Sequence, residues 1–205
     1  SSSGGSNTSE TTTPIPTTLP VIFTATINLS KDKSTIIKIE DATISIKQLE
    51  IDSDAEREIT VDIIYFPSKP EYVTELSNAY QYLQIKSLLT ENEFNKGKIT
   101  FEVPNTWLLQ NNYLEQTVAL QVFRNGEWKE VKAKFVSKDQ EGITYESKIK
   151  ELSYFAITAK SELELSWFKS LIPPKIGTRE FVLFGIIIGI AILIAVYFLV
   201  REKDE

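Results

Sequence analysis

Apolar and polar residues alternate along much of the chain, with the period of two that is typical of half-buried β-strands. After Val21, the residues Phe23, Ala25, Ile27 and Leu29 are apolar, and Thr or Asn residues separate them. The same alternation recurs around Ile44 and Ile46 and in segments 59–65, 99–103, 118–122, 131–135, 143–145 and 155–157. The pattern predicts roughly eight to ten short strands in an all-β fold, an antiparallel β-sandwich.

Two turn signals join neighbouring strands. Asn125-Gly126 favours a type I′ turn, because both central residues of that turn take positive φ. We therefore expect residues 118–123 and 128–135 to pair antiparallel. The second turn, 139–142, is expected to lead into a strand at 143–149 and to continue a meander, with its glycine, Gly142, in the left-handed conformation.

A single helical turn is expected between two of the strands. Pro104 ends the strand before it, because proline lacks the backbone N–H that a ladder needs. Asn105 or Thr106 can cap the first turn of a short helix. The cap would place Trp107 and Leu108 on the core.

Residues 181–200 depart from the alternation, because none of these residues carries a charge and most are apolar. A helix of this length is about 30 Å long, the thickness of the hydrocarbon core of a bilayer. We predict a transmembrane helix over 177–200, in contact with membrane lipid, and a cytoplasmic tail at 201–205. Gly185 and Gly189 are candidate helix-packing residues for a homo-oligomer, although glycine is also common in such helices.

The first 20 residues are rich in Ser, Thr, Gly and Pro and indicate a disordered stalk or linker. Asn7 and Asn28 each begin an N-glycosylation triplet. Such triplets also arise by chance, but beside a stalk they favour an extracellular β-sandwich, assigned to residues 21–161. Residues 162–176 are expected to form an interfacial segment, with a last edge strand as the alternative.

The composition excludes several classes of function. A net charge of −6 argues against a nucleic-acid partner, because binding to phosphates needs a basic surface. The chain has no Cys and no His, so it lacks thiol nucleophiles, imidazole bases and the usual zinc ligands. We find no catalytic motif and predict no enzymatic activity, no metal and no cofactor.

Two clusters of residues remain as candidate sites, each with a simpler interpretation. The acidic run 50–58 could supply oxygen ligands to calcium, but it lacks the glycine turn of a calcium loop and is more simply a solvated loop. Five aromatic residues could line a sugar-binding face, but alternating aromatics more often belong to the core. These five are Tyr80, Tyr82, Trp107, Trp128 and Tyr145.

Three segments carry a resemblance to a known family: Ile99-Thr100-Phe101-Glu102-Val103-Pro104-Asn105-Thr106-Trp107, Asn125-Gly126-Glu127-Trp128 and Ser153-Tyr154-Phe155-Ala156-Ile157. Together with the aromatic segment 80–85, they make residues 80–160 similar to the archaeal PGF-pre-PGF domain family. Where that family has Pro-Gly-Phe, this chain has Glu151-Leu152-Ser153, so it resembles a divergent member. The resemblance implies an archaeal surface protein, often anchored at its C-terminus and associated with the S-layer or other envelope proteins, and it implies no catalytic residues.

Two functional hypotheses follow. The first is a single-pass cell-membrane protein with a structural or interaction role, which tethers or supports envelope or membrane protein partners on the cell surface. The alternative is an accessory or ligand-binding subunit of a membrane enzyme or transporter complex.

Overall fold

The computed structural model describes residues 19–31 and 33–164. Outside the described residues lie the predicted stalk except its last two residues, the transmembrane helix 177–200, the tail 201–205 and all but the first residues of the interfacial segment. Within the described ranges, no helix is long and apolar enough to cross a membrane. The chain divides into two compact units, Ser1–Glu162 and Leu163–Glu205, and the β-strands belong to the first.

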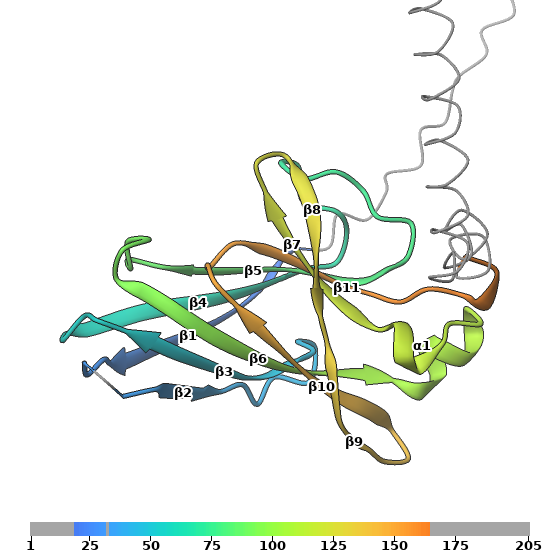
Figure 1. Cartoon of the computed structure of the whole chain (residues 1–205), viewed down its shortest axis with the longest axis horizontal. Helices are drawn as coiled ribbons and strands as arrows, with labels where there is room; N and C mark the ends of the chain where they lie inside the picture. The colour runs from blue at the N-terminus through green and yellow to red at the C-terminus, as the bar shows by residue number, and fades with distance from the viewer. Residues whose placement is uncertain (1–18, 32, 165–205) are drawn as a thin grey trace, which may run out of the picture. The chain divides into compact units, whose positions relative to one another are not determined.

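The described part of the chain contains eleven β-strands, the short helix α1 and one 3-10 helix, and a further helical segment begins at residues 162–164 (Figure 1). The first six strands are β1 (Val21–Asn28), β2 (Thr35–Lys38), β3 (Ile46–Ser53), β4 (Glu58–Phe66), β5 (Ala79–Ser87) and β6 (Phe94–Pro104). The helices α1 (Asn105–Gln110) and η1 (Glu115–Thr117) follow β6. The last five strands are β7 (Ala119–Arg124), β8 (Glu127–Lys132), β9 (Lys134–Lys138), β10 (Gly142–Ile149) and β11 (Tyr154–Thr158).

The strands form two antiparallel sheets, which confirms the predicted β-sandwich. The six-stranded sheet has the order β1-β4-β5-β11-β7-β8, and the five-stranded sheet has the order β2-β3-β6-β10-β9. The number of strands exceeds the expected range by one. Three strands have no alternating segment of their own in the sequence analysis: the short strand β2, strand β5, which was noted only as an aromatic segment, and one of the two strands β8 and β9 that share the segment 128–135.

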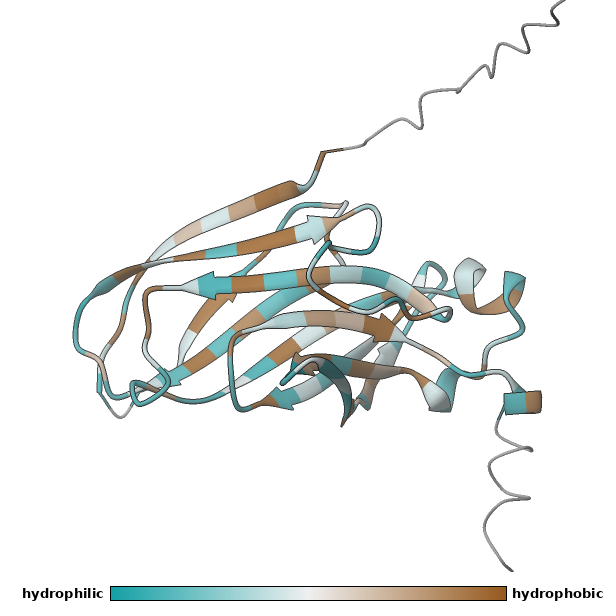
Figure 2. Cartoon of the chain, turned by 90° about the horizontal axis from the view of Figure 1, so that it is seen from above, coloured by the Kyte–Doolittle hydropathy of each residue, from teal (hydrophilic) through white to brown (hydrophobic). Residues whose placement is uncertain are grey.

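The core lies between the inward faces of the two sheets. Leu83 and Phe155 from the six-stranded sheet and Ile99 and Phe101 from the five-stranded sheet are all fully buried in one cluster. Figure 2 shows the alternation of apolar and polar residues along the strands that produces this arrangement. Burial of each such side chain contributes about 1.5–3 kcal/mol, so the sandwich is stabilised chiefly by its alternating strands.

The chain changes sheets between β8 and β9, so the predicted meander and the predicted single strand 128–135 are wrong. Trp128 pairs with Phe123 in the six-stranded sheet, whereas Phe135 pairs with Tyr145 in the five-stranded sheet. Ala133 separates the two strands. Strands at the corners of sandwiches often cross in this way, and the alternation of side chains does not reveal which sheet a segment joins.

The β7–β8 hairpin is confirmed, because Asn125 has a φ of 53° and Gly126 a φ of 81° in the turn between paired strands. The prediction for Gly142 is wrong, because it begins β10 and does not have positive φ. A Cβ at this position would lie 2.7 Å from Oε1 of Glu102 and 2.9 Å from the carbonyl oxygen of Val103, so glycine is needed for close approach.

Helix α1 follows the strand that Pro104 ends, as predicted, but its capping differs from the expectation. Pro104 is the N-cap, and the helix start has no side-chain hydrogen bond. The Asn105 side chain instead donates to the carbonyl oxygens of Asp139 and Gln140, and so ties the helix start to the β9–β10 turn. Leu108 is buried, as expected.

Candidate functional site

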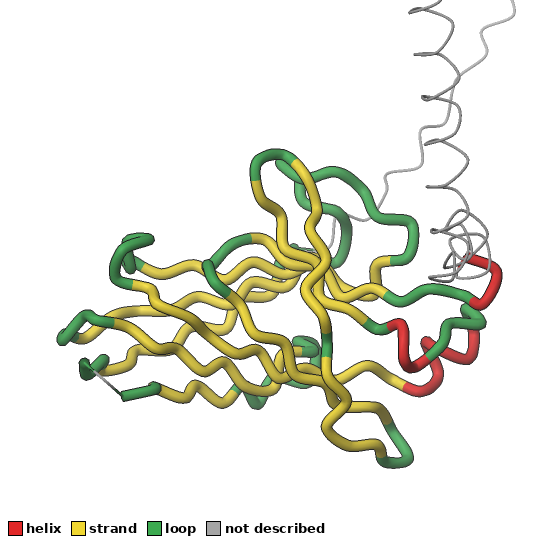
Figure 3. The backbone as a smooth tube through the Cα atoms, in the orientation of Figure 1, coloured by secondary structure: helices red, strands yellow, loops and turns green. Residues whose placement is uncertain are grey.

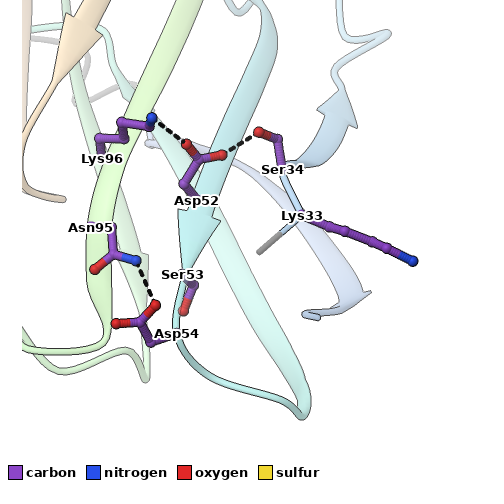
Figure 4. Close-up of a pocket in the computed structure, with 7 residues that line it drawn as sticks. All are labelled: Lys33, Ser34, Asp52, Ser53, Asp54, Asn95 and Lys96. Atoms are coloured by element: carbon purple, nitrogen blue, oxygen red, sulfur yellow. Dashed lines mark hydrogen bonds and ion pairs between the residues drawn. The ribbon is translucent and has the colours of Figure 1, made fainter. Parts of the chain in front are cut away.

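The acidic run is not a solvated loop, because its first part forms the end of β3. Figure 4 shows the polar cavity beside it, about 350 Å³ in volume. Asp52 lies between Ser34, which donates a hydrogen bond to it, and Lys96, whose Nζ is 3.1 Å from its Oδ2. Asp54 accepts a hydrogen bond of 2.8 Å from Nδ2 of Asn95.

This cavity is poorly suited to calcium, which takes six to eight oxygen ligands. Both of its carboxylates already accept hydrogen bonds from protein donors, and Lys33 and Lys96 add two positive charges to its lining. Among residues 19–31 and 33–164, no group of three or more His, Cys, Asp or Glu side chains is placed to hold a metal ion. The hydrogen bond from Ser34 lowers the pKa of Asp52, and Lys96 adds to the effect. The lining suits a neutral polar ligand better than a cation.

An ion pair next to this cavity is structural. Arg57 and Glu93 form a bidentate pair, and Glu93 also accepts a 2.9 Å hydrogen bond from the backbone N–H of Thr90. The hydrogen bond from Arg57, with that from Thr90, lowers the pKa of Glu93 to about 2. The pair joins the β3–β4 loop to the β5–β6 loop, and both oxygens of the Glu93 carboxylate are used in it.

One of the five aromatic candidates, Tyr145, belongs to the core as predicted. Its ring stacks on Phe101 with the centroids 5.8 Å apart, and its hydroxyl donates to the carbonyl oxygen of Glu115 over 2.9 Å. Burial raises the pKa of Tyr145 to about 12. The side chain is therefore a buried, hydrogen-bonded phenol.

Tyr80 and Trp107 pack against the core near α1. Their ring centroids are 4.9 Å apart, and Tyr113 continues the cluster 5.0 Å from Trp107. All three are partly buried against the core. They stabilise the placement of α1 and do not form an open stacking surface.

Tyr82 and Trp128 lie on the opposite face of the six-stranded sheet, turned away from the core. The loop 67–78, which joins β4 to β5, runs beside the β7–β8 hairpin (Figure 3) and is hydrogen-bonded to both side chains. Nε1 of Trp128 donates to the carbonyl oxygen of Thr74 over 2.7 Å, and the Tyr82 hydroxyl accepts from the backbone N–H of Leu76 over 2.7 Å. Both polar groups are therefore used to hold the loop, and the sugar-binding interpretation finds no open aromatic face here.

Two adjacent cavities flank an ion pair that the sequence did not single out. Nε of Arg124 lies 2.8 Å and 2.9 Å from the two carboxylate oxygens of Glu151, and this hydrogen bonding raises the pKa of Arg124. One cavity, about 650 Å³, is lined by Leu89, Asn92 and other residues of the β5–β6 loop. The other, about 250 Å³, includes Lys148. We call these two cavities the Arg124 groove.

The groove was missed because its walls come from three separate segments of the chain. The hairpin after β7, the β5–β6 loop and the β10–β11 turn meet there only in the folded sandwich. One feature noted in the sequence lies at this groove. Glu151-Leu152-Ser153, which stands where the resembled family has Pro-Gly-Phe, forms part of the wall.

Of the modification and packing candidates, only Asn28 lies among the described residues. It is the last residue of the edge strand β1 and is exposed, so its side chain is accessible to a glycosylation enzyme. Asn7, Gly185 and Gly189 lie outside the described residues.

Comparison with protein-family models finds no match, and comparison with curated proteins finds no similar sequence. Functional arguments for this chain therefore depend on its own residues and on its fold.

Proposed function

We propose that this chain is a membrane-anchored archaeal cell-surface protein with a structural or interaction role. The observation that carries the proposal is the uncharged run 181–200, which is long enough to span a bilayer and follows the β-sandwich in the chain. A sandwich on a single anchor is an arrangement suited to holding an envelope partner, such as an S-layer-type protein, at the membrane surface.

The chemistry of the sandwich supports a role without catalysis. A carboxylate that acts as general base at neutral pH usually has its pKa raised by burial or by a neighbouring negative charge. Here hydrogen bonds lower the carboxyl pKa values of Asp52, Glu93, Glu127 and Asp139. Within the described residues, every buried side-chain nitrogen or oxygen has a hydrogen-bond partner. These groups stabilise the fold.

The candidate glycan site supports an orientation for the proposed anchor. Asn28 is exposed on the sandwich and begins a glycosylation triplet, which favours a sandwich outside the cell and residues 201–205 in the cytoplasm. Protease added to intact cells should digest the sandwich, and a variant lacking residues 177–205 should release it into the medium. If the sandwich survives on intact cells and is digested only after lysis, the orientation is wrong.

The Arg124 groove supports the second candidate, a ligand-binding or accessory subunit of a membrane complex. Its larger cavity has room for a small polar ligand, and the guanidinium of Arg124 lines it. Purification of the full chain in mild detergent separates the two candidates. Recovery with an envelope lattice protein supports the tether, and recovery with a polytopic membrane protein supports the subunit.

A further inference from the structure

Three of the four edge strands of the sandwich are protected against pairing with another strand. Strand β8 has four charged residues among its six, and β2 is only four residues long. Strand β9 carries Lys134 and Lys138, and its pairing with β10 shifts register between Thr144 and Tyr145. Charges, bulges and short length are the usual means by which edge strands avoid additional partners.

The fourth edge, β1, has none of these features. Its eight residues include no charged residue, no proline and no glycine. Its register with β4 is continuous over all eight residue pairs. It lies at the end of the six-stranded sheet, and Ile22 on its outward face is 59% exposed (Figure 1). Among the described residues, no strand pairs with its other side, so its backbone offers donors and acceptors along that side. The exception is its last residue, because the carbonyl oxygen of Asn28 accepts a 3.5 Å hydrogen bond from Oγ1 of Thr35 at the start of β2.

We propose that β1 is a self-association surface, at which the β1 strands of two copies of this chain pair antiparallel about a two-fold axis. The two six-stranded sheets would then form one continuous sheet. In such an interface every residue of the strand meets a residue of the same sequence, and the residue on the axis meets its own copy. Because β1 has no charged residue, the pairing brings no like charges together on either strand. The inference does not depend on the proposed membrane anchor.

The pleat of the strands selects the register. Residues opposite each other must point to the same face of the sheet, so the residue numbers of each pair must both be even or both be odd. The pairing centred on Thr24 meets this condition. It sets Ile22 opposite Thr26 and Phe23 opposite Ala25, so its outward face contains only β-branched pairs, which suit adjacent strands.

Asn28 distinguishes this register from its nearest alternative. The pairing centred on Ala25 also keeps the faces matched, but it sets Asn28 opposite Ile22 within the interface. The pairing centred on Thr24 leaves Asn28 outside the paired residues, where the candidate glycan site remains accessible. We therefore assign the interface to the pairing centred on Thr24.

The chain has no cysteine, so a single introduced cysteine reports contacts without background. In the full chain, Thr24→Cys would place two cysteine Cα atoms about 4.5–5.5 Å apart across the axis, within the range that a disulfide spans. The matched control is Thr60→Cys. Thr60 lies on β4, pairs with Thr26 of β1 and is also exposed. Two copies of Thr60 would be separated by at least three strand spacings, about 14 Å, which is too far for a disulfide.

Mild oxidation of the purified full chain should give a disulfide-linked dimer of Thr24→Cys in at least about tenfold greater yield than of Thr60→Cys, because only the first pair meets the geometry. Mass spectrometry should show this chain alone in the product. Equal yields from the two variants, a product containing a different protein, or a dimer formed preferentially by Thr26→Cys would each overturn the proposal.

A second pair of variants tests association without oxidation. Thr24→Glu places two carboxylates together at the axis, near Asp62, to which the Thr24 hydroxyl donates in the wild type. Thr60→Glu adds the same charge to the same face of β4, away from the interface. Sedimentation of the detergent-solubilised chain should show loss of dimer for Thr24→Glu and retention for Thr60→Glu, with the circular dichroism spectrum of the folded sandwich in both. Retention of the dimer in both variants would contradict self-pairing through β1.

Discussion

The turn at Gly126 allows backbone strain to be separated from packing. Gly126 has a φ of 81°, and no atom lies within 4 Å of the position that a Cβ would take. Replacement by valine therefore creates no steric clash beyond the turn itself. Its cost is the strain of placing a β-branched residue in the left-handed region, about 1–3 kcal/mol.

The matched control is Gly126→Asn, because asparagine tolerates the left-handed conformation better than other residues with a Cβ. We expect Gly126→Val to lower the melting temperature by about 2–12 °C, using 2–4 °C per kcal/mol for a chain of this size. Gly126→Asn should lower the melting temperature by less than half as much. Trp128 lies two residues away in β8, so tryptophan fluorescence and far-UV circular dichroism can both follow unfolding of the chain.

Two results would refute this reasoning. An unchanged melting temperature for Gly126→Val would mean that the type I′ turn does not constrain the β7–β8 hairpin. Equal decreases in melting temperature for the valine and asparagine variants would mean that the left-handed backbone is not the source of the destabilisation, because both side chains enter the same open space.

Three further predictions concern packing, the covering loop and pH. Gly97→Ala should destabilise the sandwich by about 1–3 kcal/mol in urea unfolding, because its Cβ would lie 2.9 Å from the carbonyl oxygen of Glu50, whose strand backbone cannot easily move. Trp128→Phe should cost about 1 kcal/mol and speed proteolysis within the loop 67–78, because it removes the hydrogen bond that holds the loop; unchanged cleavage would contradict this. The pKa of Glu93 is lowered from 4.5 to about 2 by its pairing with Arg57, so its stabilising effect is complete above pH 4.5 and is lost as the pH falls toward 2. Measured unfolding midpoints between pH 6 and 2 should fall less steeply for Glu93→Gln than for the wild type.

The elements that sequence reasoning placed correctly depend on local geometry. Strand β1 was recognised from its alternation, and the β7–β8 hairpin from Asn125-Gly126. Side-chain alternation and the φ values of a turn are properties of a few consecutive residues, so they can be read without knowledge of the partner strands. The same locality explains why Leu108 was correctly placed on the core.

The candidate sites required information that only the tertiary structure contains. The Arg124 groove joins residues of three segments, and its central ion pair connects positions 27 residues apart in the chain. The acidic run was expected to be a loop, but pairing of β3 with β6 brings Lys96 against Asp52 and makes the run part of a polar cavity. Neither contact leaves a periodic signal in the sequence.

The aromatic residues show the physical limit of the pattern most clearly. Leu83 and Tyr82 are neighbours in β5 and both are buried, the first against the other sheet and the second beneath the loop 67–78. Alternation indicates that the two side chains point to opposite faces, but it cannot indicate what covers each face. The sequence by itself determined most of the strands and the tight turn at Asn125-Gly126, because these follow from local backbone preference. The tertiary structure decided the sheet to which each strand belongs and the surface that each side chain meets, because those depend on pairing between distant segments.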